Sequence, residues 1–260
     1  MRTRDGARDD AEGVTWMPTA RRTRHARTLP LTETAYALIK RSIIRCELEP
    51  GRAVSEEQLA GLYGVGRAAV RAALKRLYQE QFVEFVARQR YVVAPITLKH
   101  VQELFDVRLL LEPAAARRAA GHVDGAHLRR LNNLCQARYR VGDRASAEAF
   151  LRVNTEFHTI VARSSGNRVL ADMVVGVLEK VARVHHMGHL LRDRNEEASH
   201  EHHDLIEALV AGDGARAERL MTEQIAAARA FVLQWMLSSP SVQLANVAAG
   251  RAPSLAGAKG

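Results

Sequence analysis

The sequence has little cysteine, few aromatic residues and no long hydrophobic run. Its 260 residues include only two cysteines, Cys46 and Cys135, which excludes a disulfide-stapled scaffold and fits a reducing cytoplasm. The longest apolar stretch covers residues 173–178, far short of the ~20 residues that a membrane-spanning helix needs. The N-terminal residues mix both signs of charge and lack the apolar segment of a secretory signal. We therefore expect a soluble, cytoplasmic protein without a membrane partner.

Positive charge is unevenly distributed along the chain, whose formal net charge is +9. Residues 1–28 hold seven Lys and Arg against four Asp and Glu, and residues 29–96 hold ten against seven. Residues 97–237 are nearly balanced, with nineteen against eighteen, and residues 238–260 hold two against none. A basic segment beside a near-neutral one suggests a polyanion-binding module joined to a second unit. The alternative is a generally arginine-rich composition without functional meaning.

Proline is scarce in the second half, and this scarcity marks the domain boundaries. Six of the seven prolines lie outside residues 97–239, which favours a long helical region bounded by helix breakers. We predict a mainly α chain: a disordered arm over 1–28, a small domain over 29–96, a helical bundle over 97–237 and a disordered tail over 238–260. The bundle has room for six or seven helices of ordinary length.

The small domain shows the order of elements of a winged helix-turn-helix. Apolar residues at helical spacing predict a helix over 33–46. Ser55 and Gln58 form a capping box that begins a second helix, and Gly64 suits the tight turn before a third helix over 66–79. Two strand-like runs, 82–86 and 91–93, follow. Three helices and a hairpin in this order predict a winged helix-turn-helix, a DNA-binding fold.

The third helix carries a cationic face. Arg67, Arg71 and Lys75 stand at i, i+4 and i+8, so their side chains share one side of the helix. The opposite side predicts a core-facing stripe of Val70, Ala73, Leu74 and Leu77. The exposed surface of this helix carries only small side chains between the cations, namely those of Ala68, Ala69 and Ala72. We expect this face to enter a major groove and contact bases or phosphates; the alternative is an ordinary amphipathic helix with a solvated basic face.

The run LAGLYGVGRAAVRAALKRLYQEQFVE, followed by RQRYVVAPI, resembles the GntR family of bacterial transcription regulators. This resemblance implies that Arg67 and Arg71 contact operator DNA. The chain departs from the family pattern where Ser, Thr, Pro and Glu are usual, at Gly66, Ala68, Ala69 and Ala72. The family wing usually has a glycine where this chain has Arg90, and we expect Arg88 and Arg90 to add contacts to DNA.

Three later segments resemble the FCD effector domain of the FadR subgroup: LFDVRLLLEPAAARRAA, NTEFHTIVARSSGNRVL and EHHDLIEALVAGDGARAERLMTEQI. The resemblance implies a dimer that binds a palindromic operator and represses transcription. It also implies that a small metabolite, by analogy an organic acid, releases the protein from the DNA. Arg108 is the candidate partner of a ligand carboxylate; the alternative is that it forms a surface salt bridge.

FCD domains often hold a divalent metal through one Asp and three His. The matching positions here are Asn154, His158, His202 and Gln224. His158 and His202 keep the imidazoles, but amides are weaker ligands for Zn²⁺ or Ni²⁺ than a carboxylate and a third imidazole. We therefore expect a weakly bound metal or none. Alternatively, these four side chains hydrogen-bond an organic effector directly.

Further histidines crowd nearby, at positions 185, 186, 189, 200 and 203. His185 and His189, at i and i+4, have a spacing that can bind a metal; our preferred interpretation is that these histidines are surface or capping residues. Asp124, Asp143 and Asp213 are expected to cap the N-termini of helices in the bundle.

Two other functional classes deserve comparison with a regulator. One is a metal-dependent enzyme that uses the His-rich helical domain, and the other is a helical interaction protein that binds no DNA. The sequence lacks an HExxH motif, a Gly-rich phosphate loop and a nucleophile elbow, so we do not expect an enzyme.

Overall fold

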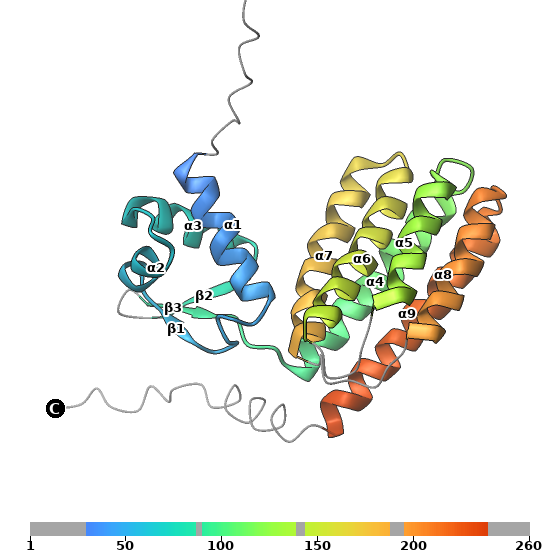
Figure 1. Cartoon of the computed structure of the whole chain (residues 1–260). Helices are drawn as coiled ribbons and strands as arrows, with labels where there is room; N and C mark the ends of the chain where they lie inside the picture. Colours follow the sequence, from blue (N-terminus) through green and yellow to red (C-terminus); the bar gives the residue numbers. More distant parts are fainter. Residues whose placement is uncertain (1–29, 87–89, 139–143, 188–194, 239–260) are drawn as a thin grey trace, which may run out of the picture.

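The computed structural model describes residues 30–86, 90–138, 144–187 and 195–238. These residues form a small mixed domain and a larger helical bundle that lie side by side (Figure 1). The elements of the small domain are α1 (Leu31–Ile44), β1 (Ala53–Val54), α2 (Glu56–Tyr63), α3 (Arg67–Gln79), β2 (Val83–Val86) and β3 (Arg90–Val93). The predicted order of three helices and a hairpin is confirmed.

The strands of the small domain form one antiparallel sheet in the order β1-β3-β2. Val83 pairs with Val93 and Ala53 with Val92. Strand β1 was not predicted, since two residues are too few to show a period. It extends the hairpin to the three-stranded sheet of a winged helix-turn-helix.

Local sequence signals set the helix-turn-helix itself. The Ser55 hydroxyl accepts a hydrogen bond from the Gln58 amide at 3.2 Å, and the Gln58 side chain accepts one from the Ser55 amide at 3.1 Å. This capping box satisfies two backbone donors at the start of α2. Gly64 ends α2 in the left-handed region with φ of 64°, a conformation that costs glycine little. The turn therefore aims α3 across α2.

The apolar core of the small domain is formed by residues from its helices and its strands. Its fully buried members include Ala35, Ile39, Ile43, Leu59, Val70, Leu74, Leu77, Phe82 and Val93. All four residues of the predicted stripe on α3 are buried. Ala69 is also buried, at 6% exposure, so the expectation that it lies on the exposed face was wrong. It lies one residue before Val70 on α3 and belongs to the apolar core of the small domain.

The second unit is built from α4 (Leu98–Ala119), α5 (Gly125–Arg138), α6 (Arg144–Ser164), α7 (Arg168–Met187), α8 (Asn195–Val210) and α9 (Gly214–Ser238). Within the described ranges the bundle thus has six helices, the lower of the two predicted numbers. Asp124 and Asp213 accept hydrogen bonds from the amides of His127 and Arg216, both at 2.9 Å. These two predicted caps are confirmed, whereas Asp143 lies outside the described residues.

Helix α4 is the centre of the bundle, because it packs against α6, α7, α8 and α9. Its apolar side chains join those of the other helices in one core, which includes Phe105, Leu128, Phe157, Leu205, Leu209 and Ile225. No helix in the described part of the chain is long and apolar enough to cross a membrane. The arm predicted for residues 1–28 lies outside the described residues, as does the tail predicted for 238–260 except for Ser238, which ends α9.

Helix α7 holds the small domain against the bundle. Lys40 of α1 pairs with Glu179 at 2.8 Å and with Glu80 at 2.9 Å. Burial by itself lowers the pKa of Lys40, but hydrogen bonds to Glu179, Tyr36 and Glu80 outweigh it and keep the pKa above its usual value. The side chain of Lys180 donates to Gln81 at 2.8 Å. Contacts from one face of α7 therefore fix α1 and the residues that follow α3.

A buried arginine of α7 completes the junction. Nη2 of Arg183 donates to the Ala94 carbonyl at 2.6 Å, and the Arg183 side chain is 3% exposed. Burial lowers the pKa of this guanidinium to about 10. Ala94 belongs to the segment between β3 and α4, so this hydrogen bond ties the link between the two units to α7.

Candidate functional site

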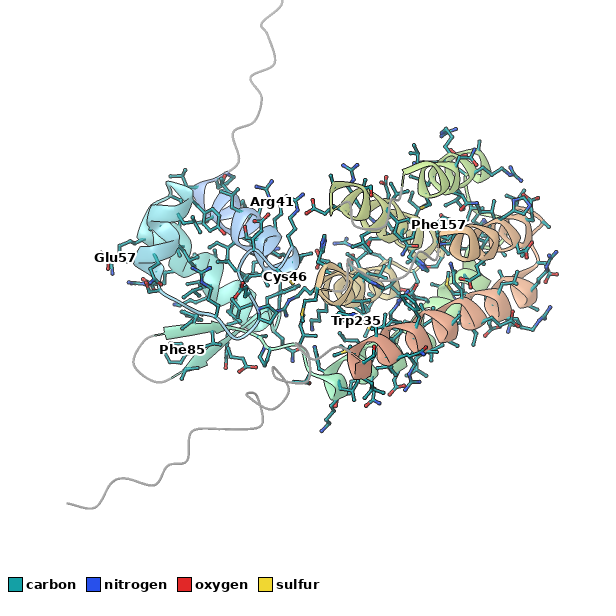
Figure 2. All side chains as sticks on the ribbon, turned by 60° about the horizontal axis from the view of Figure 1, so that its bottom comes forward. Arg41, Cys46, Glu57, Phe85, Phe157 and Trp235 are labelled. Atoms are coloured by element: carbon teal, nitrogen blue, oxygen red, sulfur yellow. The ribbon has the colours of Figure 1, made fainter. Side chains whose placement is uncertain are left out.

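The cationic face of α3 points to solvent. Arg67, Arg71 and Lys75 are all exposed, while the opposite side of the helix is buried in the core. The side of the small domain that carries Glu57 and Phe85 faces away from the bundle (Figure 2). The spacing of four residues thus produces the exposed basic face that the sequence predicts.

Arg71 is held in place by an acid at the start of α2. Its Nε donates to Glu56 Oε1 at 2.9 Å and its Nη2 to Oε2 at 2.9 Å. The Arg71 side chain remains 58% exposed. This hydrogen bond from Arg71 lowers the pKa of Glu56. The ion pair neutralises the middle cation and fixes its direction, a feature that sequence spacing alone did not reveal.

The wing is only partly described. Arg88 lies outside the described residues, and Arg90 begins β3 without a described side chain. Next to the wing, Phe85 and Tyr91 meet edge to face, with ring centroids 5.3 Å apart. With Lys75, Tyr78 and Gln79 they line a shallow pocket of about 340 Å³. Phe85 is exposed and Tyr91 is half-buried. Neither ring was singled out from the sequence, where both look like ordinary strand residues.

A second group of polar side chains lies buried in the bundle. Arg108 and Glu112 of α4 are 5% and 2% exposed, and His158 of α6 is 3% exposed. Arg108 Nε donates to Glu112 Oε1 at 2.5 Å. His158 Nδ1 is 2.6 Å from Glu112 Oε2, an ion-pair contact without hydrogen-bond geometry. We call these three residues the buried triad.

Glu112 stays ionised because of its neighbours. Burial by itself raises the pKa of the carboxyl group, but the charges of Arg108 and His158 outweigh burial and lower the pKa to about 2. The alternative that Arg108 forms a surface salt bridge is therefore wrong: Arg108 pairs with Glu112, and this pair is buried. Glu112 itself was not predicted as a site residue. Its spacing of four from Arg108, within an apolar run, was the available signal.

Two further predicted site residues lie close to the triad. His202 of α8 is 0% exposed, and its ring stacks on Phe157 with centroids 4.1 Å apart. The rings of His158 and His202 have centroids 5.8 Å apart. Gln224 of α9 is 7% exposed. Both ring nitrogens of His202 and Oε1 of Gln224 are buried without a hydrogen-bond partner, and such groups call for a ligand or water.

Helix α7 adds His185, a half-buried residue that we had interpreted as a surface or capping histidine. Burial lowers its pKa to about 3, and the charges of Arg108, His186 and His158 act in the same direction. His186 is only 8% exposed, so the surface interpretation was wrong for that residue. Asn154 is half-buried on α6, while His189 lies outside the described residues. Tertiary packing makes His186 part of the interior and partly covers His185 and Asn154.

Comparison with known proteins finds a matching family for the small domain and for the helical bundle. Residues 31–93 match the bacterial regulatory proteins of the gntR family, and residues 103–227 match the FCD domain. The chain belongs to the GntR family and carries an FCD domain. It is therefore a DNA-binding transcription regulator with an effector-binding domain, and its matched domains are not those of an enzyme.

Similar proteins cover most of this GntR-family chain. The repressor RspR of Escherichia coli (strain K12) is 26% identical over 199 residues, which are 76% of this chain and 87% of that protein. The repressor GlaR of the same strain is 27% identical over 207 residues, 73% of this chain and 90% of that protein. The solved structure of E. coli McbR/YncC has the same fold, with a TM-score of 0.68 and 23% identity over 80% of this chain and 99% of that chain.

Some FCD domains bind metals, but the donor set of this chain does not fit zinc or nickel. Asn154 and Gln224 supply amides, and Glu112 is committed to Arg108. Among the described residues, no group of three or more His, Cys, Asp or Glu side chains is placed to hold a metal ion. The expectation of a weakly bound metal or none at His158 and His202 stays a prediction, and metal analysis of the purified protein tests it.

Proposed function

We propose that this regulator binds a palindromic operator as a homodimer, with α3 of each copy in a major groove. Arg67, Arg71 and Lys75 contact bases or phosphates, and Arg88 and Arg90 of the wing add contacts beside them. The observation that carries this assignment is the exposed basic face of α3, opposite a fully buried stripe. A helix that presents cations to solvent and apolar residues to its own domain suits groove binding.

We also propose that the protein represses transcription until an effector binds. Both relatives compared above are named repressors, which favours this sign of regulation over activation. The effector changes operator affinity only if it binds the two arrangements of the domains unequally.

The effector site that we propose is the interior around the buried triad, His202 and Gln224. Glu112 contacts Arg108 through Nε, so the Nη1–Nη2 edge of the guanidinium is the candidate donor to a ligand carboxylate. An organic acid at this edge would leave Glu112 in place and satisfy Arg108 from its other side. The imidazole of His202 and the amide of Gln224 would hydrogen-bond the remainder of the ligand, with Asn154 at the rim.

Helix α7 connects the proposed effector site to the DNA-binding domain. His185 lies within electrostatic range of Arg108 and His158. Two and five residues earlier on the same helix, Arg183 and Lys180 bind Ala94 and Gln81, and Glu179 binds Lys40. A ligand that displaces His185 therefore acts on a helix that also fixes the winged domain.

One experiment tests both halves of this proposal. Fluorescence anisotropy measures binding to the promoter region upstream of the protein's own gene at two salt concentrations, because phosphate contacts make affinity salt-dependent. A panel of small organic acids is then screened for release of the DNA. His158→Ala should blunt that release and leave DNA binding without effector unchanged, whereas Arg219→Ala, on exposed α9 surface, should alter neither. Release unchanged in His158→Ala would place the effector elsewhere.

A further inference from the structure

A cavity of about 630 Å³ lies between the two units of the chain, and we call it the interdomain cavity. Its lining comes from α1 of the small domain and from α6 and α7 of the bundle. Arg41 of α1 lines it and lies on the side of the small domain nearer the bundle (Figure 2). Pockets of about 300–1,000 Å³ are the size that binds small organic molecules. The interdomain cavity therefore has room for a ligand that touches both units.

The two bundle helices each present one side to this cavity. Arg152, Thr155 and Thr159 follow steps of three and four along α6, and Glu179, Ala182 and His186 do so along α7. Residues at such steps lie one above another on a helix. The cavity is thus built from continuous helix faces.

The interdomain cavity is separate from the buried triad. On α6, His158 is buried beside Glu112, whereas the next residue, Thr159, lines the cavity. On α7, His185 lies within electrostatic range of His158, whereas the next residue, His186, lines the cavity. Neighbouring residues of an α-helix are about 100° apart around its axis. Helices α6 and α7 therefore form the wall between the two spaces.

Part of the cavity lining is apolar. Ile44 of α1, Ala149 and Leu151 of α6 and Ala182 of α7 line it, and each of them is half-buried. The two alanines are short, which leaves space that a longer side chain would fill. A ligand with an apolar body would lose contact with water against these residues, and this loss favours binding.

Two ion pairs beside the cavity join its walls. Arg45 of α1 pairs with Glu148 of α6, and Lys40 of α1 pairs with Glu179 of α7 at 2.8 Å. The negative charges of Glu148 and Glu179 are therefore compensated within the chain.

The other charged residues of the lining are Arg41, Arg152 and Glu156. All three are exposed, and none has a side-chain hydrogen bond or ion pair within the part of the chain that the structure describes. Two positive charges against one negative charge leave an excess of one positive charge. A guanidinium group pairs well with planar or tetrahedral acid groups, so this excess favours a ligand with a single negative charge.

We infer that the interdomain cavity binds an organic monoanion with an apolar body, such as an aromatic carboxylate or sulfonate. Its acid group contacts Arg41 of the small domain and Arg152 of the bundle, and its body packs against Ile44 and Ala182. Because the two arginines belong to different units, a ligand held by both ties the small domain to the bundle. The inference goes beyond the proposed function, since it adds a second ligand site outside the interior of the bundle.

Fluorescence titration of the full chain with anilinonaphthalene sulfonate tests the inference, because this monoanion brightens in an apolar site. Arg41→Ala and Arg152→Ala should each weaken binding of the sulfonate about fivefold, as for one exposed charge contact. Glu156→Gln should tighten it, because the remaining negative charge is removed. Phenylnaphthylamine has the same rings without the sulfonate, and all three variants should bind it as the wild type does. Arg163→Ala, on an exposed position of α6 outside the cavity, is the matched control.

Filling the cavity gives a second test. Ala182→Phe should prevent saturable binding of both probes, with the thermal unfolding temperature preserved; if this variant does not fold, Ala149→Phe fills the same space from α6. His158→Ala should bind both probes as the wild type does, because the triad lies on the other side of α6.

Three results would overturn the inference. The first is sulfonate binding that is unchanged in either arginine variant, because the acid group would then not join the two units. The second is binding that survives in the folded phenylalanine variant. The third is loss of sulfonate binding in His158→Ala, which would place the anion in the proposed effector site instead. Operator binding is measured without the probe, so each of these results leaves the DNA-binding assignment intact.

Discussion

The two units of this protein use arginine–glutamate pairs in opposite ways. In the winged domain, Arg71 and Glu56 meet at the surface, where the arginine stays 58% exposed. In the bundle, Arg108 and Glu112 meet with side-chain exposures of 5% and 3%. The exposed pair leaves Arg71 accessible to an external polyanion, and solvent screening weakens the attraction between the two charges. Solvent does not screen the buried pair, so removal of either partner leaves the other charge buried without compensation.

The same contrast holds for histidine. In the bundle, His158, His186 and His202 are buried and His185 is half-buried. The described part of the winged domain contains no histidine. A DNA-binding surface needs charges that do not change at physiological pH, whereas a ligand site benefits from groups that both donate and accept. Four predictions, from the largest expected effect to the smallest, test this difference between the units.

The largest effect is expected from removing the buried acid. Glu112→Gln leaves the Arg108 guanidinium buried without a counterion, and such losses typically cost about 3–5 kcal/mol. Urea unfolding followed by circular dichroism measures the change in the free energy of unfolding. The matched substitution Glu56→Gln breaks the exposed pair and should cost less than about 1 kcal/mol. Equal losses in the two variants would show that burial does not distinguish these pairs.

The pH dependence of stability should come from the bundle. Burial, and then the charge of His158, lowers the pKa of His202 to about 3, so below pH 6.5 the unfolded chain binds a proton that the folded chain does not. Stability therefore falls as pH falls, by about 1.4 kcal/mol per pH unit for such a group, or roughly 2 kcal/mol between pH 7 and pH 5. Urea unfolding at both pH values measures this loss.

His202→Gln should remove this share of the pH dependence and leave the share that belongs to His185, whose pKa is also lowered to about 3. His203→Gln is the matched control, because His203 is the exposed neighbour on the same helix. A pH profile that is unchanged in His202→Gln would mean that this imidazole takes up its proton at the same pH in the folded protein as in the unfolded chain.

On α3, Arg67→Ala or Arg71→Ala should weaken operator binding by about 1–3 kcal/mol without loss of stability. The reason is that these side chains are exposed and support no core residue. Anisotropy titrations with the operator and with an unrelated duplex separate base contacts from phosphate contacts. Arg163→Ala, at an exposed position of α6 in the bundle, is the control. Operator binding that is the same in all three variants would refute the assignment of α3.

The smallest effect is expected from Glu56→Gln on DNA binding. In the proposed complex Glu56 competes with DNA for Arg71 and repels phosphates, so its neutralisation should tighten binding to any duplex by less than about tenfold. Binding to the operator should gain no more than binding to unrelated DNA. A loss of operator affinity would instead mean that Glu56 positions Arg71 for a base contact.

The winged domain could be predicted from the sequence almost completely, because its signals are local. The capping box at Ser55, the turn at Gly64 and the four-residue spacing of Arg67, Arg71 and Lys75 each act within a few residues. What these signals missed, the Glu56–Arg71 pair, joins two helices across the turn. In the bundle, periodicity and the caps at Asp124 and Asp213 indicated helices, but not which polar residues would meet.

The sequence by itself determined the order of the helices, the cationic face of α3 and the identity of the polar residues available to the bundle. Only the tertiary structure decided that Arg108, Glu112 and His158 meet in the interior, that His186 is buried and His185 half-buried, and that α7 contacts both units. The physical reason is range: helix capping and face periodicity depend on neighbours three or four residues away. The burial of a charge depends on helices that are distant in the chain and close in space.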